Sequence, residues 1–420
     1  MKLTKESNKL MSFFIKHNCL MPIKQTKKTD NILKSLYSNI KDGVSYVQNE
    51  KDKLQSKFYK LKITSVTNIS QIPRPVTFPP NSFPDKIRKH IDDYGLTVLT
   101  YSFKLYNREI NIIFLTEDED PDSIVSIYNK YVDYMLVWLY IVNIYSSKSC
   151  VDELKIYIYH TSLLKLLPST NIEILNSSHV NTAFTRTCPK KSEIVVFRKE
   201  EWFKAFIHET FHNFGLDFSD MNQSQCNSKI LSIFPVNSEV NLYESYTEFW
   251  ARIINALMCS YINMTDKNNI EEFLTNAEFF INFERIFSFF QMIKVLNFMD
   301  MSYTDMYKKD PNSNNIRKLM FKEHTSVLSY YVITLILMNS YQDILSWCNE
   351  SNDNLLQFKK TSRNLESFCK LIEKKYRTRS LLDGIKCSED LFINVEKRLK
   401  KQKSLLYLMK SLRMTICELG

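Results

Sequence analysis

The chain has 420 residues, of which 44% are hydrophobic and 13% aromatic, and its formal net charge is +10. These values are typical of a folded globular protein with one large core or two to three smaller ones. Only five residues are glycine, and the sequence contains neither GxGxxG nor GKS or GKT. This argues against nucleotide enzymes that use a glycine-rich phosphate loop, so no nucleotide cofactor is expected.

The positive charge comes mostly from dispersed lysines and is densest in residues 396–413, EKRLKKQKSLLYLMKSLR. A basic surface can contact nucleic acid. However, the sequence shows no recognition motif that combines basic and aromatic residues. We therefore interpret the lysines as a solvated surface and expect no nucleic-acid partner.

Nine cysteines are spread along the sequence without a CxxC pair, so we expect free thiols in a reducing compartment. The first 24 residues lack the cleavage site of a secretory signal. The two most apolar windows, 134–145 and 330–341, are shorter than the roughly 20 residues that a membrane span needs. We expect both to be buried helices and the protein to be cytoplasmic, without a membrane span.

The first part of the chain is polar. Residues 1–71 contain one helical pattern, over 31–63. Five prolines follow within 72–84, IPRPVTFPPNSFP, and proline prevents a helix there. We expect residues 72–90 to form an extended connector that leads into the next domain.

Sharper patterns follow in a predicted core over residues 91–262 and a helical C-terminal lobe over 263–420. In the core we predict a hairpin over 96–116 with its turn at Asn107-Arg108, a helix over 120–147, strands over 153–161, 179–188 and 193–198, and helices over 199–214 and 241–261. In the lobe we predict helices separated by loops near 264–269, 309–315 and 351–361. The order indicates an α+β fold.

The stretch AFIHETFHNFGLDF, residues 205–218, places His208 and His212 four residues apart, with Glu209 directly after the first histidine. Residues i and i+4 share one face of a helix, so the two imidazoles can converge on one point. Catalytic zinc keeps three protein ligands and a water, which a neighbouring glutamate can deprotonate. The alternative is an ordinary amphipathic helix that carries two histidines.

A third ligand must decide between these interpretations, and the residues that directly follow the motif do not supply it. Gly215 stands where a glycine turn is needed, but three residues later comes Phe218, which cannot bind metal. Asp217 is one place off, and on a continued helix it would lie about 140° from His212.

The helix predicted over 241–261 offers a better third ligand. Glu244 and Glu248 lie on one of its faces at i, i+4. Glu244 can bind the metal, while Glu248 accepts a hydrogen bond from the other ring nitrogen of His208. Cys226, between the two helices, is a rival ligand that would compete with Glu244.

HETFH followed by ESYTEFWA resembles the zincin superfamily, and within it the gluzincins, the thermolysin-like zinc metallopeptidases. The resemblance covers about residues 179–260 and implies an α+β fold: a mixed sheet with helices, the HExxH helix beneath it and an all-helical C-terminal lobe. It implies Zn²⁺ as cofactor, bound by His208, His212 and Glu244, with Glu209 as the general base that activates zinc-bound water and Glu248 as support for His208. Residues 179–219 also resemble proteins of large DNA viruses.

The resemblance further implies two sets of residues at the cleft. In zincins an edge strand before the motif helix binds the substrate backbone by strand addition, which here implies Asn181, Thr182, Ala183 and Phe184. Family members also stabilise the oxyanion with a Tyr or His. The first candidate is His324, which Glu323 could orient, and the others are Tyr330, Tyr331, Tyr243 and Tyr246.

We therefore expect a zinc metalloendopeptidase that hydrolyses an extended polypeptide in the cytoplasm, which would be the host cytoplasm or the virion for a viral protein. Two alternatives remain. The first is a catalytically silent zincin-fold protein with a structural or virion-associated role, favoured if residues 1–90 block the cleft; that segment could equally be a removable inhibitor. The second is a basic nucleic-acid-binding protein in which HETFH is accidental.

Overall fold

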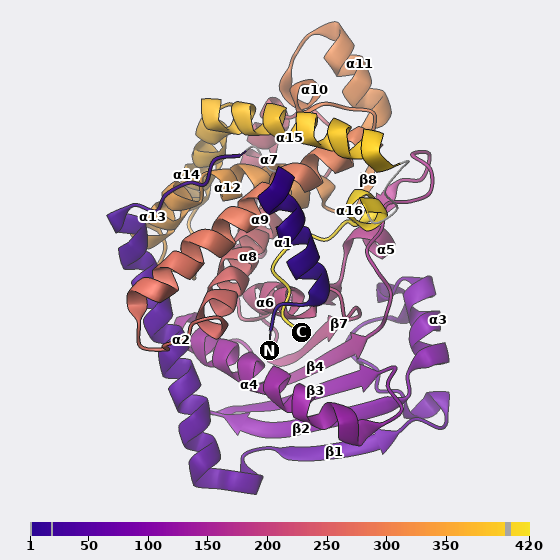
Figure 1. The fold of residues 1–420 in the computed structure, drawn as a ribbon, viewed down its shortest axis with the longest axis vertical. Helices are drawn as coiled ribbons and strands as arrows, with labels where there is room; N and C mark the ends of the chain where they lie inside the picture. Colours follow the sequence, from indigo (N-terminus) through magenta and orange to yellow (C-terminus); the bar gives the residue numbers. More distant parts are fainter. Residues whose placement is uncertain (1, 18–19, 400–404) are drawn as a thin grey trace.

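The protein has a mixed α+β fold, with a twisted sheet in the lower part of Figure 1 and a larger helical half above it. The computed structural model describes residues 2–17, 20–399 and 405–420. Residues 400–404 of the predicted basic stretch lie outside the described residues.

The main sheet is six-stranded, in the order β1-β2-β3-β4-β7-β6. The pairs β1·β2, β2·β3 and β6·β7 are antiparallel, whereas β3·β4 and β4·β7 are parallel. The strands are β1 (Lys60–Ser65), β2 (Thr97–Leu105), β3 (Arg108–Thr116), β4 (Glu153–His160), β6 (Ala183–Thr185) and β7 (Lys191–Val196). The predicted hairpin is confirmed as β2 and β3, and β6 is an edge strand.

Both faces of the sheet are covered. Successive side chains of a strand point to opposite sides, so neighbouring residues of one strand belong to different cores. Val98 and Leu115 belong to a smaller core with the helix α3 (Asp85–Tyr94). Their neighbours Leu99 and Phe114 belong to the main core, which continues through the helical half. The sheet thus separates a thin outer layer from the body of the protein.

The remaining elements form the helical half and its connections to the sheet. A small two-stranded sheet pairs β5 (Leu175–Asn176) with β8 (Glu323–His324). The helices are α1 (Lys5–His17), α2 (Lys27–Leu54), α4 (Pro121–Tyr145), α5 (Ser177–Val180), α6 (Trp202–Asn213), α7 (Ser224–Ile233), α8 (Leu242–Ile262), α9 (Ile270–Phe298), α10 (Tyr303–Tyr307), α11 (Pro311–Met320), a π-helix (Leu328–Ile333), α12 (Thr334–Asn339), α13 (Tyr341–Ser351), α14 (Ser362–Lys375), α15 (Arg379–Leu399) and α16 (Leu406–Lys410).

The N-terminal segment differs from the prediction of one helix over 31–63. The helix α2 ends at Leu54, Gln55 takes a positive φ, and Lys60–Ser65 become the strand β1. The alternation of Leu61 and Ile63 with polar residues suits a strand on a half-covered edge, and this tertiary pairing overrides the helical pattern. Because α2 packs against α4, α9 and α13, the segment is part of the main body.

The proline-rich stretch also differs from the predicted connector. The backbone N–H groups of Val76 and Thr77 donate to the buried carboxylate of Glu193, at 3.0 and 2.7 Å. After Pro84 the chain forms the helix α3, which packs on the sheet. Residues 72–90 are therefore irregular and then helical, and they lie against the core.

The apolar windows are interior helices, as predicted. Residues 134–145 lie in α4, and residues 330–341 run through the π-helix and α12 into α13, with most of their side chains buried. Within the described residues, no helix has both the length and the apolar character that crossing a bilayer requires.

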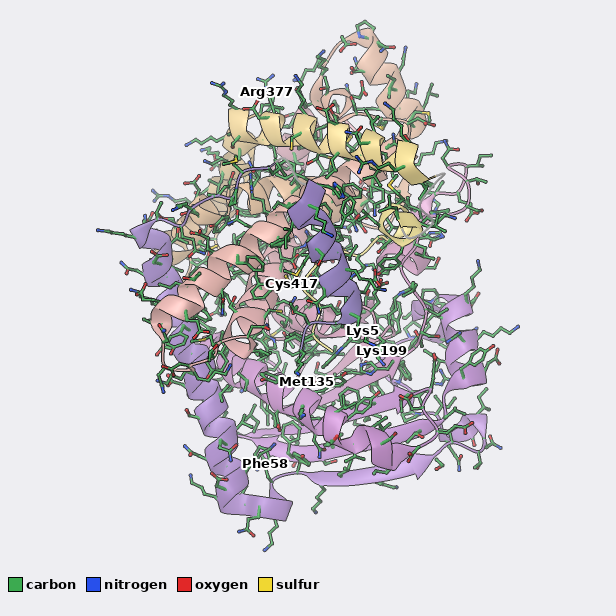
Figure 2. The ribbon with its side chains drawn as sticks, viewed as in Figure 1. Lys5, Phe58, Met135, Lys199, Arg377 and Cys417 are labelled. Carbon is green, nitrogen blue, oxygen red and sulfur yellow. A yellow bond between two sulfur atoms is a disulfide. The ribbon has the colours of Figure 1, made fainter. Side chains whose placement is uncertain are left out.

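The C-terminal half is mostly helical as predicted, with three differences. The strand β8 interrupts the helices at Glu323–His324. The loop predicted near 309–315 is limited to residues 308–310, because Asp310 caps α11 and Pro311 suits its first turn. Residues 411–420 are not helical but run extended through the interior, where Cys417 is fully buried (Figure 2). The two described chain ends lie side by side, and Lys2 and Gly420 exchange backbone hydrogen bonds of 3.1 and 2.9 Å.

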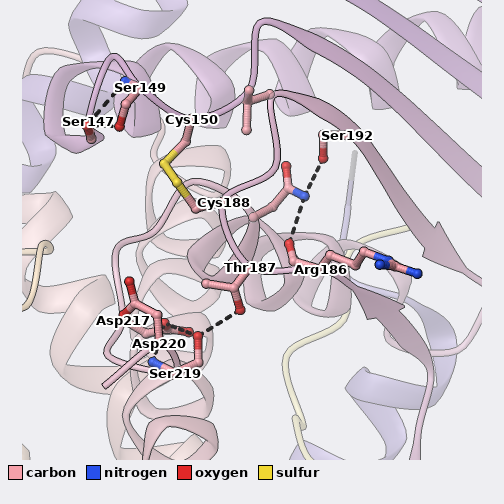
Figure 3. The surroundings of a disulfide bond; sticks show 12 residues. Ser147, Ser149, Cys150, Arg186, Thr187, Cys188, Ser192, Asp217, Ser219 and Asp220 are labelled. Carbon is pink, nitrogen blue, oxygen red and sulfur yellow. Dashed lines mark hydrogen bonds between the residues drawn. A yellow bond between two sulfur atoms is a disulfide. The ribbon is translucent and has the colours of Figure 1, made fainter. Parts of the chain in front are cut away.

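The prediction of free thiols throughout is wrong. Disulfides join Cys150 to Cys188 and Cys226 to Cys369, across 38 and 143 residues of sequence. Such separations leave no signature in the sequence, since the partners meet only in the folded chain. Cys150–Cys188 ties the segment before β4 to the loop between β6 and β7 (Figure 3).

Replacing both Cys150 and Cys188 by serine should lower the free energy of unfolding by about 2–4 kcal/mol, because the bond restricts the unfolded chain. Urea denaturation of the wild type and of the double variant, both without reductant, measures the difference. Equal midpoints and slopes would show that this bond does not stabilise the fold.

Candidate metal centre

The site is built on α6, and every residue of this helix is buried. Its apolar side chains, among them Phe206, Ile207 and Phe211, are fully buried in the main core. The helix packs against β6 and β7 on one side and α8 on the other. His208 and His212 follow one another at i, i+4 and face α8, as the sequence predicts.

Three ligand-type atoms converge between α6 and α8. The Nε2 atoms of His208 and His212 lie 3.2 Å apart, and Oε2 of Glu244 lies 3.0 Å from the first and 3.5 Å from the second. These three residues form a group that can hold a metal ion. The structure thus brings together the three ligands predicted from the sequence, one of them 32 residues beyond the motif.

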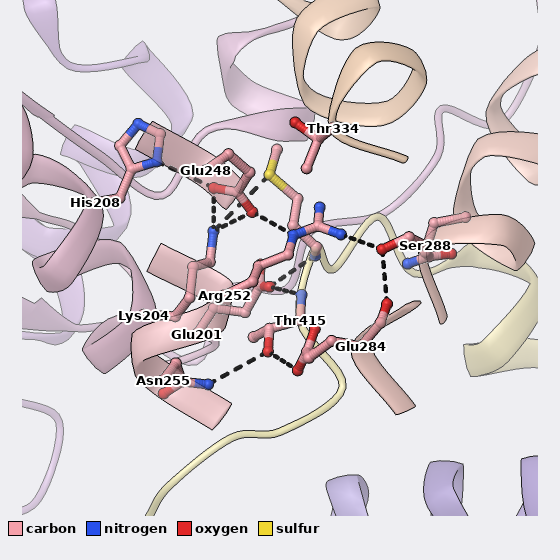
Figure 4. Close-up of polar contacts among 12 residues, drawn as sticks. Glu201, Lys204, His208, Glu248, Arg252, Asn255, Glu284, Ser288, Thr334 and Thr415 are labelled. Carbon is pink, nitrogen blue, oxygen red and sulfur yellow. Dashed lines mark hydrogen bonds and ion pairs between the residues drawn. The ribbon is translucent and has the colours of Figure 1, made fainter. Parts of the chain in front are cut away.

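Glu248 holds the ring of His208 from behind (Figure 4). Its Oε2 lies 3.0 Å from Nδ1 of His208, while Lys204 contacts both carboxylate oxygens at 3.0 Å and Arg252 donates at 2.8 Å. Burial raises the pKa of Glu248, but Lys204 and Arg252 outweigh burial and hold that pKa well below its usual value. An ionised carboxylate only accepts hydrogen bonds, so Nδ1 carries the proton and Nε2 faces the other ligands.

Asp217 plays the same part for His212, and sequence reasoning missed it. The helix ends at Asn213, and Gly215 takes a positive φ of 67°, so the chain turns back. Asp217 Oδ2 therefore reaches Nδ1 of His212, while Oδ1 accepts hydrogen bonds from the N–H and hydroxyl of Ser219 at 2.9 and 2.8 Å (Figure 3). On a continued helix Asp217 would lie about 140° from His212, but Gly215 indicates in the sequence that the helix ends before it.

Charge couples the three residues tightly. Burial lowers the pKa of His212, but Asp217 and Glu244 outweigh it and hold that pKa well above its usual value. Burial raises the pKa of Glu244, but the two histidines outweigh burial and hold that pKa well below its usual value. The carboxylate is therefore ionised at neutral pH and is ready to act as a ligand.

Glu209 lies in the wall of a cavity beside His208. Burial raises its pKa, and the neighbouring His208 and His212 oppose that rise. The side chain is 7% exposed. A carboxylate that is buried, adjacent to the candidate ligands and open to a cavity has the properties of a general base.

Tyr330, rather than His324, reaches the site from the helical half. The Tyr330 hydroxyl donates to Glu244 Oε2 at 3.0 Å, and its ring centroid lies 6.1 Å from that of His208. His324 is exposed on β8, opposite Asn176, and its neighbour Glu323 bonds Ser238 instead of orienting it. The sequence placed both candidates in one region but could not tell which of them faces α6.

The other tyrosines and Cys226 have different roles. The Tyr246 hydroxyl donates to the carbonyl of Leu356, and the Tyr331 hydroxyl donates to that of Leu412. Tyr243 lies with its ring 5.8 Å from that of His212. Cys226 is bound in a disulfide with Cys369 and so is not a ligand.

The edge strand borders the same cavity. Asn181, Thr182 and Ala183 line it, together with His208 and Glu209. Phe184 points to the opposite face of the sheet, where its ring packs against those of Phe78 and Phe83 at 4.9 and 5.2 Å. Ala183 and Phe184 take opposite faces because successive side chains of β6 alternate, whereas Asn181 and Thr182 precede the strand.

The described residues that line this cavity come from positions 165, 180–183, 204, 205, 208, 209, 248, 330 and 414. None of them belongs to residues 1–90. A blockage of this cavity by the N-terminal segment, which would have favoured a silent scaffold, is therefore not seen among the described residues.

Metal content of the purified protein tests the site. We expect His208→Ala and Glu244→Ala to abolish metal binding, because each removes one ligand. Asp217→Ala should weaken the metal affinity by about 10–100-fold, because it frees the ring of His212. Elemental analysis and titration against a chelator measure both effects.

Asp220→Asn is the matched control, since Asp220 is exposed three residues away and contacts Lys360. It should leave metal affinity unchanged. An Asp217→Ala variant with wild-type affinity would remove Asp217 from the site.

Comparison with known proteins adds no assignment. The chain matches no protein-family model, and no curated protein or solved structure matches it.

Proposed function

We propose that the protein is a zinc-dependent metallopeptidase of the zincin type, with a gluzincin arrangement of ligands, which hydrolyses extended polypeptide. The observation that carries the proposal is the convergence of the two imidazoles and the Glu244 carboxylate. It is supported by carboxylates at both Nδ1 atoms, because Glu248 and Asp217 turn both Nε2 atoms toward one point.

The spacing of the ligand atoms fits zinc. With zinc–ligand distances of about 2.0–2.1 Å, two ligands of a tetrahedral ion lie about 3.3–3.4 Å apart. The three separations here are 3.0, 3.2 and 3.5 Å. Two imidazoles, which are neutral when Nε2 binds a metal in place of a proton, and one carboxylate form a typical catalytic zinc set, which keeps a fourth position open.

Zinc held at this point would lower the pKa of a water molecule to about 7 and polarise a carbonyl group. Glu209 would accept the proton of the attacking water and deliver it to the leaving amine. Burial raises the pKa of Glu209 toward the working range of a general base. Its place in the cavity wall beside His208 supports this role.

The edge strand is the proposed binding site for the substrate backbone. Phe197 N–H donates to the Thr182 carbonyl at 2.9 Å, so these two residues form a hydrogen-bonded pair across the strands. Pairs alternate along antiparallel strands, so Ala183, opposite Val196, directs its N–H and C=O away from β7. A substrate in extended conformation can bond these two groups, as in strand addition.

Tyr330 is the proposed oxyanion donor. Burial, followed by Glu244 and Glu209, raises the pKa of Tyr330 well above its usual value, so its hydroxyl stays protonated. That hydroxyl can exchange its hydrogen bond with Glu244 for one to the oxygen of a tetrahedral intermediate.

Replacing Glu209 by alanine should leave zinc bound and lower peptidase activity by about 10²–10⁴-fold, because the variant keeps the ligands but loses the base. Zinc analysis and cleavage of a random peptide library by mass spectrometry measure the two properties. Glu239→Gln, an exposed carboxylate just before α8, serves as the control with unchanged activity.

Two results would contradict the proposal. Undiminished cleavage in Glu209→Ala would show that the activity comes from elsewhere. Bound zinc without cleavage by the wild type would favour the silent scaffold.

Tyr330→Phe should lower kcat by about 10²–10³-fold with little change in KM, because it removes a hydrogen bond made mainly in the transition state. His324→Ala, measured beside it, tests the assignment made from the sequence. A larger loss of kcat in His324→Ala than in Tyr330→Phe would return the role to His324.

A further inference from the structure

The cavity beside Glu209 is small. It lies between the start of β6 and the first half of α6 and has a volume of about 30 Å³. Space of this size holds only one or two water molecules, since a single water needs about 10–15 Å³ of it. A group bound next to the proposed zinc site therefore has room here for hydrogen, a methyl group or a hydroxyl, but not for a large side chain.

One wall of the cavity comes from the far end of the chain. Met414 lies in the extended segment 411–420, yet it lines the cavity with Ala205 and His208. Its sulfur lies 3.9 Å from Nζ of Lys204, and the residue is 3% exposed. No pattern in the sequence links this methionine to a motif 200 residues earlier.

The backbone around Met414 is fixed by buried carboxylates. Glu201, just before α6, accepts the N–H groups of Met414 and Thr415 at 2.7 and 2.6 Å. Glu284 accepts those of Ile416 and Cys417 at 3.1 and 2.9 Å. These anchors fix the backbone at Met414 and beyond it, which places the methionine side chain at the cavity.

The polar walls are equally fixed. Lys204 is bound to Glu248, and Lys165 donates to Glu201 at 2.8 Å. Both lysines are already paired within the protein, so they do not select an acidic group. The apolar walls of Val180, Ala205 and Met414 thus decide the size of what enters.

We propose that this cavity receives the substrate side chain next to the scissile bond and that Met414 restricts it to glycine, alanine or serine. The proposal rests on the proposed function, because it takes the three-residue group as the zinc site. It makes Met414 a specificity-determining residue and gives the substrates a class: extended polypeptides with a small residue at the cleavage point.

Binding of amino-acid hydroxamates tests the size limit without turnover. Glycine, alanine, leucine and phenylalanine hydroxamates are titrated into the zinc-loaded full chain by calorimetry. The wild type should bind the leucine and phenylalanine compounds at least about 10-fold more weakly than the alanine compound, because their extra methylene groups exceed the space of this small cavity. Met414→Ala should reduce this difference in affinity between the alanine compound and the two larger ones to below about 3-fold. Met414→Leu, which conserves volume, should keep the wild-type difference.

Met409→Ala is the matched control, because Met409 is a buried methionine on α16 that lies outside the cavity lining. In Met409→Ala the difference in affinity between the alanine compound and the two larger ones should equal that of the wild type. Equal binding of all four compounds by the wild type would overturn the proposal. The proposal would also be overturned if Met414→Ala kept the wild-type difference in affinity, or if Met409→Ala reduced that difference as much as Met414→Ala does.

A cleavage assay on the same proteins separates the two hypotheses. A peptide library cut only beside small residues by the wild type, and beside larger ones by Met414→Ala, supports both the peptidase and the role of Met414. Size-selective hydroxamate binding without any cleavage would refute the peptidase but would still show that Met414 limits the size of the group bound in the cavity. Cleavage with no size preference in either protein would refute only the role of Met414.

Discussion

The fold around the candidate site depends on neutralising charge that is buried between α6 and α8. Glu248 is the centre of this arrangement, since it contacts Lys204, Arg252 and His208 at once. An unpaired carboxylate in that position would cost several kcal/mol. The same contacts that remove this cost also fix the imidazole, so stability and ligand geometry have one cause.

Short-range periodicity was enough to predict much of the molecule. The hairpin β2–β3, the strands β4 and β7, and the helices α4, α6 and α8 follow from alternation or helical spacing within one element. His208, His212 and Glu244 could likewise be predicted as metal ligands. The two histidines share one face of their helix, and Glu244 and Glu248 share one face of theirs. That the two helices pack together is a tertiary contact, and only the resemblance to gluzincins predicted it.

Features that depend on chain reversal or on distant partners could not be predicted. Asp217 meets His212 only because Gly215 reverses the chain, and Tyr330 faces Glu244 only because the π-helix packs on α8. The strand β1, the disulfides and the buried segment 411–420 likewise need partners tens to hundreds of residues away. Local sequence carries no record of such contacts.

The anchoring of residues 414–417 has a consequence for how the protein can change in evolution. Glu201 and Glu284 bind main-chain N–H groups, which every residue except proline possesses. The segment can therefore exchange side chains while its path stays fixed. A single substitution at position 414 would alter the shape of the cavity without rebuilding the scaffold, whereas the glutamates that hold the path have no such freedom.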